Sequence, residues 1–352
     1  MMKLYPSIML LTTLVAQSQI QAWSSHTNPE IEQLHPKPVC VDNRSGLVEL
    51  DYLFWKPYQE DMHYAVRTKQ STESGTIDLK VRPKSPEYDL SSGVRLGVGV
   101  YTSDVWDVKL RGTYLYSDNT EEQHAIGSST DALFPSVFPF LQGQAGNQTK
   151  SYWRLNFGLG DLTLGRTTTL SPKFNVRPFI GIRSVFMRQL FKNQFDAVAG
   201  TSIVPGAFRN TSNVWGIGPR AGLDSTYYFA DHWSFQGGLS GSLVLGNFRA
   251  RQKLLGFNGP SHLKVHVKDS SAMIRANLDG YLGIGWDMFF NNNKNRVHVA
   301  LLCDTSYWFG INQFMDLNVN SATLPVSGSV GVDKRHGDLA FFGGTVHFQM
   351  DF

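Results

Sequence analysis

Hydrophobic and polar residues alternate along most of this chain, in segments of about ten residues. The last fifteen positions show the pattern well, because Phe342, Phe348 and Phe352 share one register while His347 and Asp351 share the other. A period of two with one apolar face predicts a half-exposed β-strand. A terminal strand of this kind, ending on an aromatic residue, is typical of bacterial outer-membrane barrels, whose closing strand faces lipid on one side and the lumen on the other.

Nine further segments alternate in the same way, so the prediction is ten strands. They cover residues 47–56, 93–100, 106–116, 153–160, 176–183, 215–229, 233–245, 274–288 and 297–307. An even number suits a barrel whose two ends both lie in the periplasm. Two β-like pieces within 62–82 would raise the count to twelve. The predicted fold is an all-β, antiparallel up-and-down transmembrane barrel of about ten strands.

The connections between these segments alternate between short and long. Residues 103–104, 230–232 and 291–295 have the composition of tight turns, whereas 57–88, 118–150, 192–211, 249–270 and 310–337 are long and polar. Short periplasmic turns and long extracellular loops are typical of such barrels. Residues 161–172 would then form one longer periplasmic connection.

The first residues have the composition of an export signal. Lys3 is the single charge of residues 1–22, an apolar core covers 8–16, and small and polar residues follow. The core is too short for a membrane helix, and no later run approaches the roughly 18 apolar residues that one needs. We therefore expect a signal peptide at 1–22, a periplasmic segment at 23–45 and a barrel at 46–352, placed in the outer membrane of a Gram-negative cell.

Aromatic residues on the apolar register gather near the strand ends, as interfacial girdles do. A soluble β-sandwich would bury such residues centrally instead. We expect one set at the periplasmic interface and another at the outer interface. The first set consists of Trp106, Tyr227, Phe229, Trp233, Trp286 and Phe352, and the second includes Trp153 and Trp215.

The opposite register carries charges of both signs, which we expect to line the lumen. The acidic members are Glu49, Asp51, Asp107, Asp224, Asp279, Asp287 and Asp304, and the basic members are Arg95, Lys109, Arg111, Arg154, Arg177, Arg183, Arg220 and Arg275. They form either an ion-filtering pore lining or a salt-bridge network that fills a narrow interior. Eight strands leave a filled interior and sixteen or more a water channel, so ten predict a tight or gated conduit. The sequence leaves both interpretations open.

Four passages resemble the Legionella-type pore-forming (major) outer-membrane protein family, which also occurs in chlamydia-related bacteria. They are residues 48–57 with 62–65, then 161–166, 177–183 and the closing 338–352, so the resemblance spans the whole predicted barrel. It implies a β-barrel major outer-membrane protein or porin. It supplies neither a solute nor any catalytic residue.

The predicted function is a porin-like barrel that lets ions or small solutes diffuse through. The main alternative is an adhesin or structural surface protein that acts through its loops, and a lesser one is an omptin-like outer-membrane protease. His298 with Asp304, or His347 with Asp351, would be the histidine–carboxylate pairs of such an enzyme, but spacing alone shows no catalytic geometry. We therefore expect no enzyme activity, no catalytic residues, no metal and no cofactor.

Expected partners follow from the membrane assignment. They are the outer-membrane lipid and the barrel assembly machinery, which would bind the C-terminal strand. A formal net charge of +3 gives no argument for nucleic acid. The glycines of Gly216-Ile-Gly218-Pro-Arg-Ala-Gly222 resemble a dinucleotide loop, but they lie inside a strand and precede no helix, so they should face the lumen.

Two cysteines and one apolar passage complete the picture. Cys303 falls on the lipid-facing register and should be an inert thiol. Cys40 precedes the first strand, where the oxidising periplasm would leave it free or cross-linked to another envelope protein. The apolar residues 132–141 lie in a long polar segment. They constrict the barrel mouth, form an adhesive patch, or pack against neighbouring loops.

Overall fold

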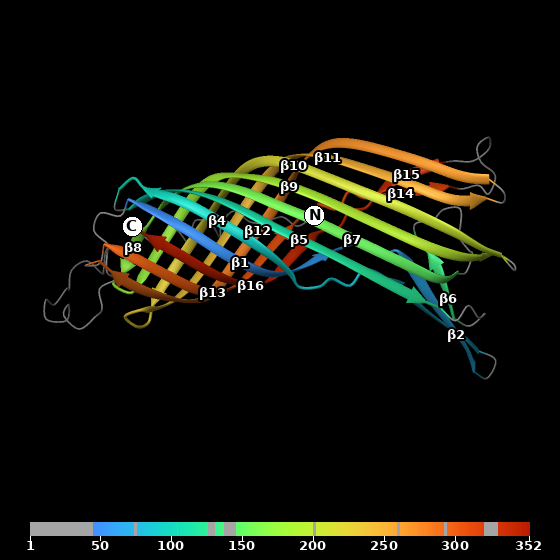
Figure 1. Cartoon of the computed structure of the whole chain (residues 1–352), viewed down its shortest axis with the longest axis horizontal. Helices are drawn as coiled ribbons and strands as arrows, with labels where there is room; N and C mark the ends of the chain where they lie inside the picture. Colours follow the sequence, from blue (N-terminus) through green and yellow to red (C-terminus); the bar gives the residue numbers. More distant parts are fainter. Residues whose placement is uncertain are drawn as a thin grey trace, which may run out of the picture.

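The computed structural model describes residues 45–73, 76–103, 105–125, 131–136, 146–199, 202–258, 261–291, 294–319 and 330–352. Ten antiparallel strands in these ranges close into one barrel (Figure 1), as the alternation predicts. They are β1 (Gly46–Gln59), β4 (Ser91–Tyr101), β5 (Trp106–His124), β7 (Gly146–Arg166), β9 (Phe174–Ala199), β10 (Ser202–Tyr228), β11 (Trp233–Asn258), β12 (Ser261–Phe290), β13 (Asn295–Trp308) and β16 (Leu339–Asp351).

The first and last strands close the ring. β16 pairs with β13 on one side and with β1 on the other, in a ladder that runs from Leu47↔Asp351 to Gln59↔Leu339. The amides of Ser45 and Gly46 both donate to the Phe352 carbonyl, at 2.8 and 2.9 Å. Closure leaves the barrel without an open sheet edge, which a strand in hydrocarbon could not tolerate.

Six short strands lie outside the ring. They are β2 (Ala65–Glu73), β3 (Thr76–Lys84), β6 (Asp131–Pro135), β8 (Thr168–Ser171), β14 (Met315–Val319) and β15 (Val330–Lys334). β2, β3 and β6 project from the end of the barrel that is opposite the C-terminus (Figure 1). β14 and β15 lie towards the same end and pair with each other as a separate two-stranded antiparallel sheet. The β-like pieces within 62–82 are therefore real strands, but they stay out of the wall, so the twelve-strand alternative is wrong. Within the described residues, no helix is long and apolar enough to cross a membrane.

Three segments predicted as connections belong largely to strands. β9 and β10 pair as far as Ala199↔Ser202, and β11 and β12 as far as Asn258↔Ser261, so 192–211 and 249–270 are not long loops. Residues 161–172 are mostly β7 and β8. The charged residues of the first two segments lie mostly on the outward register, whereas the inward register carries buried Phe195 and Phe208 together with buried amides such as Gln252.

The wall changes its chemistry along its length, and β11 shows the change. Near the periplasmic turns its outward residues are Leu239, Leu243 and Leu245, and its inward residues are Ser240 and Ser242; further along, the outward residues are Arg249, Arg251 and Lys253, and the inward ones are Val244, Phe248 and Leu254. A strand surrounded by lipid needs an apolar outer face, whereas a strand in water needs its apolar face inside. The far half of the barrel is therefore built to stand outside the membrane.

One apolar cluster fills this outer half, and we call it the apolar plug. The barrel strands contribute Trp153, Leu155, Phe157, Phe191, Trp308 and Phe341, and the connections contribute Met62, Tyr64, Tyr88, Leu133, Ile311 and Phe314. The ring centroids of Phe157 and Phe341 lie 4.6 Å apart, and Trp308 meets Phe157 edge-on at 5.9 Å. Because these side chains are almost completely buried, they fill the extracellular side of the lumen.

Part of the apolar passage 132–141 joins this cluster. Residues 131–135 form β6, which pairs with β2 and touches β7, and Leu133 is completely buried in the plug. For these residues, packing against neighbouring segments is the correct interpretation. Residues 137–141, the expected signal peptide, and the expected periplasmic segment up to residue 44, with Cys40, lie outside the described residues. Cys303 is exposed on the outer face of β13, on its predicted register.

Candidate functional site: the charged lumen

The predicted lumen residues, with one exception, point into the barrel. They come from strands around the ring and occupy the half next to the periplasmic turns, except Arg275, which lies at the level of the apolar plug, 5.8 Å from the Phe248 ring. The inward set comprises Glu49, Asp51, Arg95, Lys109, Arg111, Arg177, Arg183, Arg220, Asp224, Arg275, Asp279, Asp287 and Asp304. Asp107 lies inward with them and is buried. The alternation along each strand was sufficient to place them.

The exception lies on β7, where two predictions are wrong. Trp153, expected at the outer membrane interface, is fully buried in the apolar plug, 4.9 Å from the Tyr88 ring between centroids. Arg154, expected in the lumen, points outward, where its Nε donates to the Tyr152 hydroxyl at 2.6 Å. The prediction assigned the apolar register to lipid, but in this outer part of β7 the apolar side chains fill the interior instead.

The other predicted interface residues do lie on the outer face. Trp106, Trp215, Trp233 and Phe352 are exposed there, and Trp286 is half-buried opposite Trp233 in the ladder. Trp233, Trp286 and Phe352 lie near the periplasmic turns. Trp215 lies where the outer face of β10 changes from apolar to polar, which is where an outer girdle is expected.

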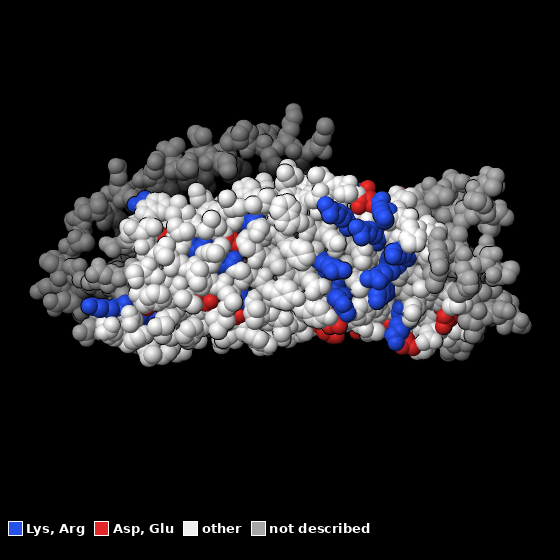
Figure 2. Space-filling view, turned by 45° about the horizontal axis from the view of Figure 1, so that its top comes forward, with Lys and Arg blue, Asp and Glu red and all other residues white. Residues whose placement is uncertain are grey.

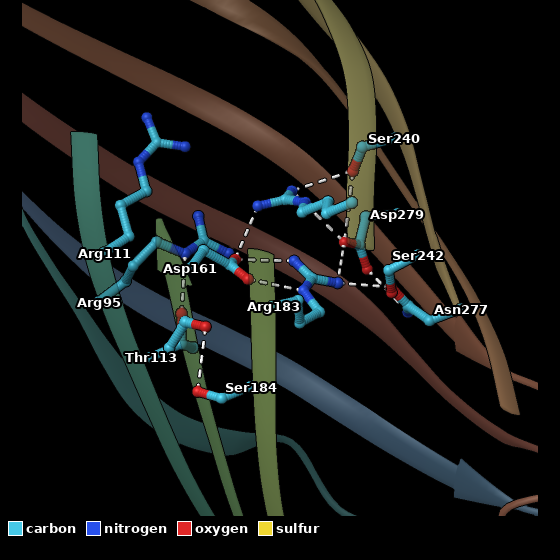
Figure 3. A network of polar contacts seen from close by, with 12 residues as sticks. Arg95, Arg111, Thr113, Asp161, Arg183, Ser184, Ser240, Ser242, Asn277 and Asp279 are labelled. Atoms are coloured by element: carbon cyan, nitrogen blue, oxygen red, sulfur yellow. Dashed lines mark hydrogen bonds and ion pairs between the residues drawn. The ribbon is translucent and has the colours of Figure 1, made fainter. Parts of the chain in front are cut away.

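Arg183 is the centre of the largest charge network (Figure 3). Its guanidinium makes a bidentate contact with Asp161, at 2.7 and 2.8 Å, and also donates to Asn277 and Asp279. Arg183 is on β9 and Asp279 on β12, so their contact connects parts of the wall that are separated by β10 and β11. Arg220 adds contacts to Asp161 at 2.7 Å and to Ser240 at 2.9 Å. The network reaches across the lumen instead of lining it.

Two smaller networks lie closer to the periplasmic end. Glu49 accepts from Lys109 Nζ and from Arg111 Nη2, each at 3.0 Å. Arg177 binds Asp107 and, through Nη1, Asp224 at 2.9 Å. Each carboxylate inside the barrel thus faces at least one guanidinium or ammonium group, which is the condition for keeping charges in a partly desolvated interior.

Asp161 was absent from the predicted lining, although it is a principal partner of Arg183. The sequence does contain a signal for it. Up to Leu159 the apolar residues of β7 are odd-numbered, whereas Leu162 and Leu164 are even-numbered, so the apolar register changes at Gly160–Asp161. A change of register within one strand marks the level at which the lumen turns from apolar to charged.

The two lumen histidines have partners that differ from those predicted. His298 Nδ1 lies 2.8 Å from Asp287 Oδ1, and His347 Nδ1 lies 2.6 Å from Asp51 Oδ1. The expected pairings with Asp304 and Asp351 are wrong. Successive residues of a strand are about 3.4 Å apart, so Asp304 lies about 20 Å from His298 and Asp351 about 14 Å from His347, whereas a cross-strand neighbour is within reach.

Glycines on the inward register give the arginines room. A Cβ at Gly165 would lie 2.4 Å from the Arg177 guanidinium, and one at Gly222 would lie 2.5 Å from the Ser240 side chain. The glycines of the 216–222 passage face the lumen, as predicted. It is at Gly165 that the missing Cβ leaves room for an arginine, Arg177, against the wall.

A cavity of about 720 Å³ remains in the charged half. It extends from the level of Arg183 and Asp279 to the periplasmic turns, where Thr167 and Asp231 line it. Guanidinium groups, carboxylates and hydroxyls line its surface. In the part of the chain that the structure describes, no group of three or more His, Cys, Asp and Glu side chains is placed to hold a metal ion. Such a surface can bind ions and polar solutes through charge and hydrogen bonds.

Comparison with known proteins gives one family. Residues 42–352 match the family model of the Legionella pneumophila major outer membrane protein precursor. No curated protein sequence matches the chain. Similar solved structures include the outer membrane protease OmpT of Escherichia coli (7% identity, 88% of this chain and 96% of that chain, TM-score 0.42). The toluene transporter TodX of Pseudomonas putida (9%, 93% and 95%, TM-score 0.35) and OprG of Pseudomonas aeruginosa (11%, 87% and 97%, TM-score 0.28) are others.

Proposed function

The chain belongs to the family of the Legionella pneumophila major outer membrane protein, and from this premise we propose that its barrel is a gated, porin-like conduit for ions or small polar solutes. The charged cavity carries the proposal. A protein that needed only a sealed scaffold would gain more from an apolar interior, because buried ion pairs are rarely better for stability than packed hydrophobic residues. A lumen charged on every side is what a permeating ion requires.

The apolar plug is the proposed gate, because much of it comes from connections and not from the wall. Two of these connections, the one that follows β1 and the one that follows β13, are hydrogen bonded to each other. The side-chain amide of Asn312 donates to the Glu60 carbonyl at 2.9 Å, and Arg335 donates to the Asp61 carbonyl at 2.8 Å and to Asp316 at 2.9 Å. Separation of these two connections would withdraw Met62 and Phe314 from the lumen.

Several buried polar groups in the plug support an opening motion. Trp153 Nε1, Trp308 Nε1 and both polar atoms of the Gln252 amide have no hydrogen-bond partner among the described residues. A buried group left unpaired costs about 1–3 kcal/mol. Water that enters an opened lumen would hydrogen bond to these groups, which lowers the free energy of the open state relative to the closed one.

Planar bilayer recordings test the gate. The variant Met62→Ala/Phe314→Ala shortens the two inserted side chains and should raise the open probability severalfold over the wild type. Leu282→Ala is the matched control, because it shortens an apolar side chain on the lipid face, 71% exposed, and should leave conduction unchanged. Failure of both the wild type and the plug variant to conduct, when both are folded, would overturn the conduit.

Ion selectivity tests the lumen separately. Asp279→Asn removes one negative charge from the network around Arg183 and should shift the reversal potential towards anion preference. Arg154→Gln removes a charge from the outer face and should leave the reversal potential where it is. Equal shifts for the two variants would mean that the current does not pass the lumen charges.

The second candidate is an adhesin or structural surface protein, and the completeness of the apolar plug favours it. Liposome swelling with sugars of graded size separates the two functions. Uptake supports the conduit. Absence of uptake by both the wild type and Met62→Ala/Phe314→Ala, together with binding to cells that depends on the outer connections, supports the adhesin.

A further inference from the structure

Cations gather on one side of the outer half of the barrel. They are the outward side chains of five adjacent strands, β7, β9, β10, β11 and β12, and they form the blue patch of Figure 2. We call this set the basic belt. It comprises Arg154, Arg188, Lys192, Arg209, Arg249, Arg251, Lys253 and Lys268.

The strand register arranges the belt in rows. Lys192, Arg209, Lys253 and His266 are successive cross-strand partners in one row. In the next row towards the membrane, Arg251 lies opposite Lys268. In the row after that, Arg188 and Arg249 lie on either side of Asn213. Cross-strand side chains are about 5 Å apart, and like charges at that distance destabilise a sheet. An anion shared between the strands would remove this repulsion.

Acidic neighbours within the protein do not remove it. Beside the belt, Lys150 forms an ion pair with Glu122 at 3.6 Å. Among the described residues, no carboxylate lies within 4.0 Å of the charged groups of Lys192, Arg209 or Lys253. These three side chains line a hollow of about 630 Å³ on the outer face, together with Tyr152 and His266.

The position of the belt relative to the membrane indicates the source of the anion. The row directly below Arg188 and Arg249 contains Phe186, Trp215 and Asn247, where the outer face turns apolar. Rows are about 7 Å apart along the strands. The belt therefore begins one row above the lipid-facing surface and continues through the depth that lipid headgroups occupy.

The other side of the barrel lacks such a feature. On the outward faces of the described parts of β1, β4, β5, β13 and β16, the only Lys or Arg is Lys56. Large apolar side chains, including Phe309 and Phe342, are exposed on that side. The asymmetry shows that the cations are not a general requirement for solubility of the outer half.

We propose that the basic belt binds the phosphorylated headgroups of anionic lipid in the outer leaflet, on the β7–β12 side of the barrel. Lys192, Arg209 and Lys253 hold one phosphate-bearing headgroup in the hollow, and the arginines nearer the membrane contact the groups below it. Guanidinium and ammonium groups pair strongly with phosphate oxygens. The inference does not depend on conduction through the lumen.

Native mass spectrometry of the purified full-length protein in detergent tests this inference, with bis-phosphorylated lipid A and phosphatidylcholine as probes. The variant is Lys192→Gln/Arg209→Gln/Lys253→Gln. Each cation near an anionic lipid surface accounts for roughly fivefold in affinity, so the variant should bind lipid A roughly a hundredfold more weakly. The matched control, Lys56→Gln/Lys69→Gln/Lys80→Gln, loses the same charge elsewhere and should bind lipid A like the wild type.

Further arms identify the ligand. Lipid A should bind the wild type more tightly than phosphatidylcholine, and inorganic phosphate should compete only weakly, because it lacks the acyl chains that bind the apolar surface below. Equal lipid A binding by the belt variant and the wild type, with unchanged circular dichroism, would overturn the proposal. The proposal would also be overturned if the belt variant lost binding to a sulfated polysaccharide but still bound lipid A, because the belt would then be a site for a soluble polyanion.

Discussion

The two halves of this barrel are made from the same strands with their faces exchanged. In the membrane half, the outward residues are apolar and the inward ones are charged, as Ile180 and Arg183 on β9 illustrate. In the outer half the same strand turns Arg188 outward and Phe191 inward. Alternation determines which residues share a face, whereas the surrounding solvent determines which face is apolar. One continuous strand can therefore satisfy two solvents.

The comparison also separates two ways of filling a narrow barrel. Ten strands enclose too little space for a wide water channel. The outer half is filled by aromatic rings, and the membrane half by arginine–aspartate contacts around a residual cavity of about 720 Å³. Removal of a side chain should therefore change the free energy of unfolding by different amounts in the two halves, and for different physical reasons.

The largest effect is expected in the apolar plug. Phe157→Ala should lower the free energy of unfolding by about 3–5 kcal/mol, because it leaves a cavity between Phe341 and Trp308. The measurement is urea unfolding in lipid vesicles, followed by tryptophan fluorescence. The control is Phe342→Ala on the outer face, 64% exposed, which should cost much less. Equal losses would contradict the assignment of a core to the outer half.

The lipid-facing surface should give the next largest effect. Leu278 is exposed on the outer face of β12, and Leu278→Arg should cost about 2–4 kcal/mol near the bilayer midplane, because lipid cannot solvate the charge. Asn247→Arg, beside Trp215 at the proposed outer interface, should cost only about 0–1 kcal/mol. Refolding into vesicles measures both. If Leu278→Arg is as stable as the wild type, the assignment of this half of the barrel to the membrane is wrong.

A smaller loss is expected in the charged lumen. Loss of one partner from a dry buried ion pair costs about 3–5 kcal/mol, but the adjoining cavity admits water to Asp161 and Asp279. We therefore expect about 2 kcal/mol for Arg183→Met, below the value for a dry site. Arg183→Met/Asp161→Asn should recover part of the loss in the same unfolding measurement, because fewer carboxylates remain unpaired. No recovery would indicate that Arg183 acts through packing.

The sequence predicted the membrane half well and the outer half poorly, for one physical reason. Lipid outside and charge inside give an alternation whose direction is known in advance, so Asp279 and Arg183 could be placed without a structure. Beyond the membrane the direction reverses, and Trp153 and Arg154 were assigned to the wrong faces. The partners of His298 and His347 depend on register between strands, which alternation within a strand does not contain.

The smallest expected effect concerns how the outer extension docks on the apolar half. Arg67 of β2 makes a bidentate contact with Asp131 of β6, with Nε–Oδ1 at 2.8 Å and Nη2–Oδ2 at 2.6 Å. These hydrogen bonds, more than the long-range charge attraction, hold the pKa of Asp131 below its ordinary value of about 3.9. A carboxyl whose pKa is depressed on folding adds stability above the unfolded pKa, and this is lost as the pH falls through the folded pKa.

Docking of β2 on β6 should therefore be constant from neutral pH down to about 4 and should weaken below it. Hydrogen exchange of the β2 amides measures this. Asp131→Asn should weaken docking by up to about 1 kcal/mol, as expected for a partly exposed ion pair, and should abolish the dependence on acid. Asp78→Asn, which removes the exposed contact to Lys80 at 3.7 Å, is the control and should change neither. If β2 exchanges at the same rate from pH 7 to pH 3, the pair contributes nothing and the apolar contact of Leu133 alone holds the extension.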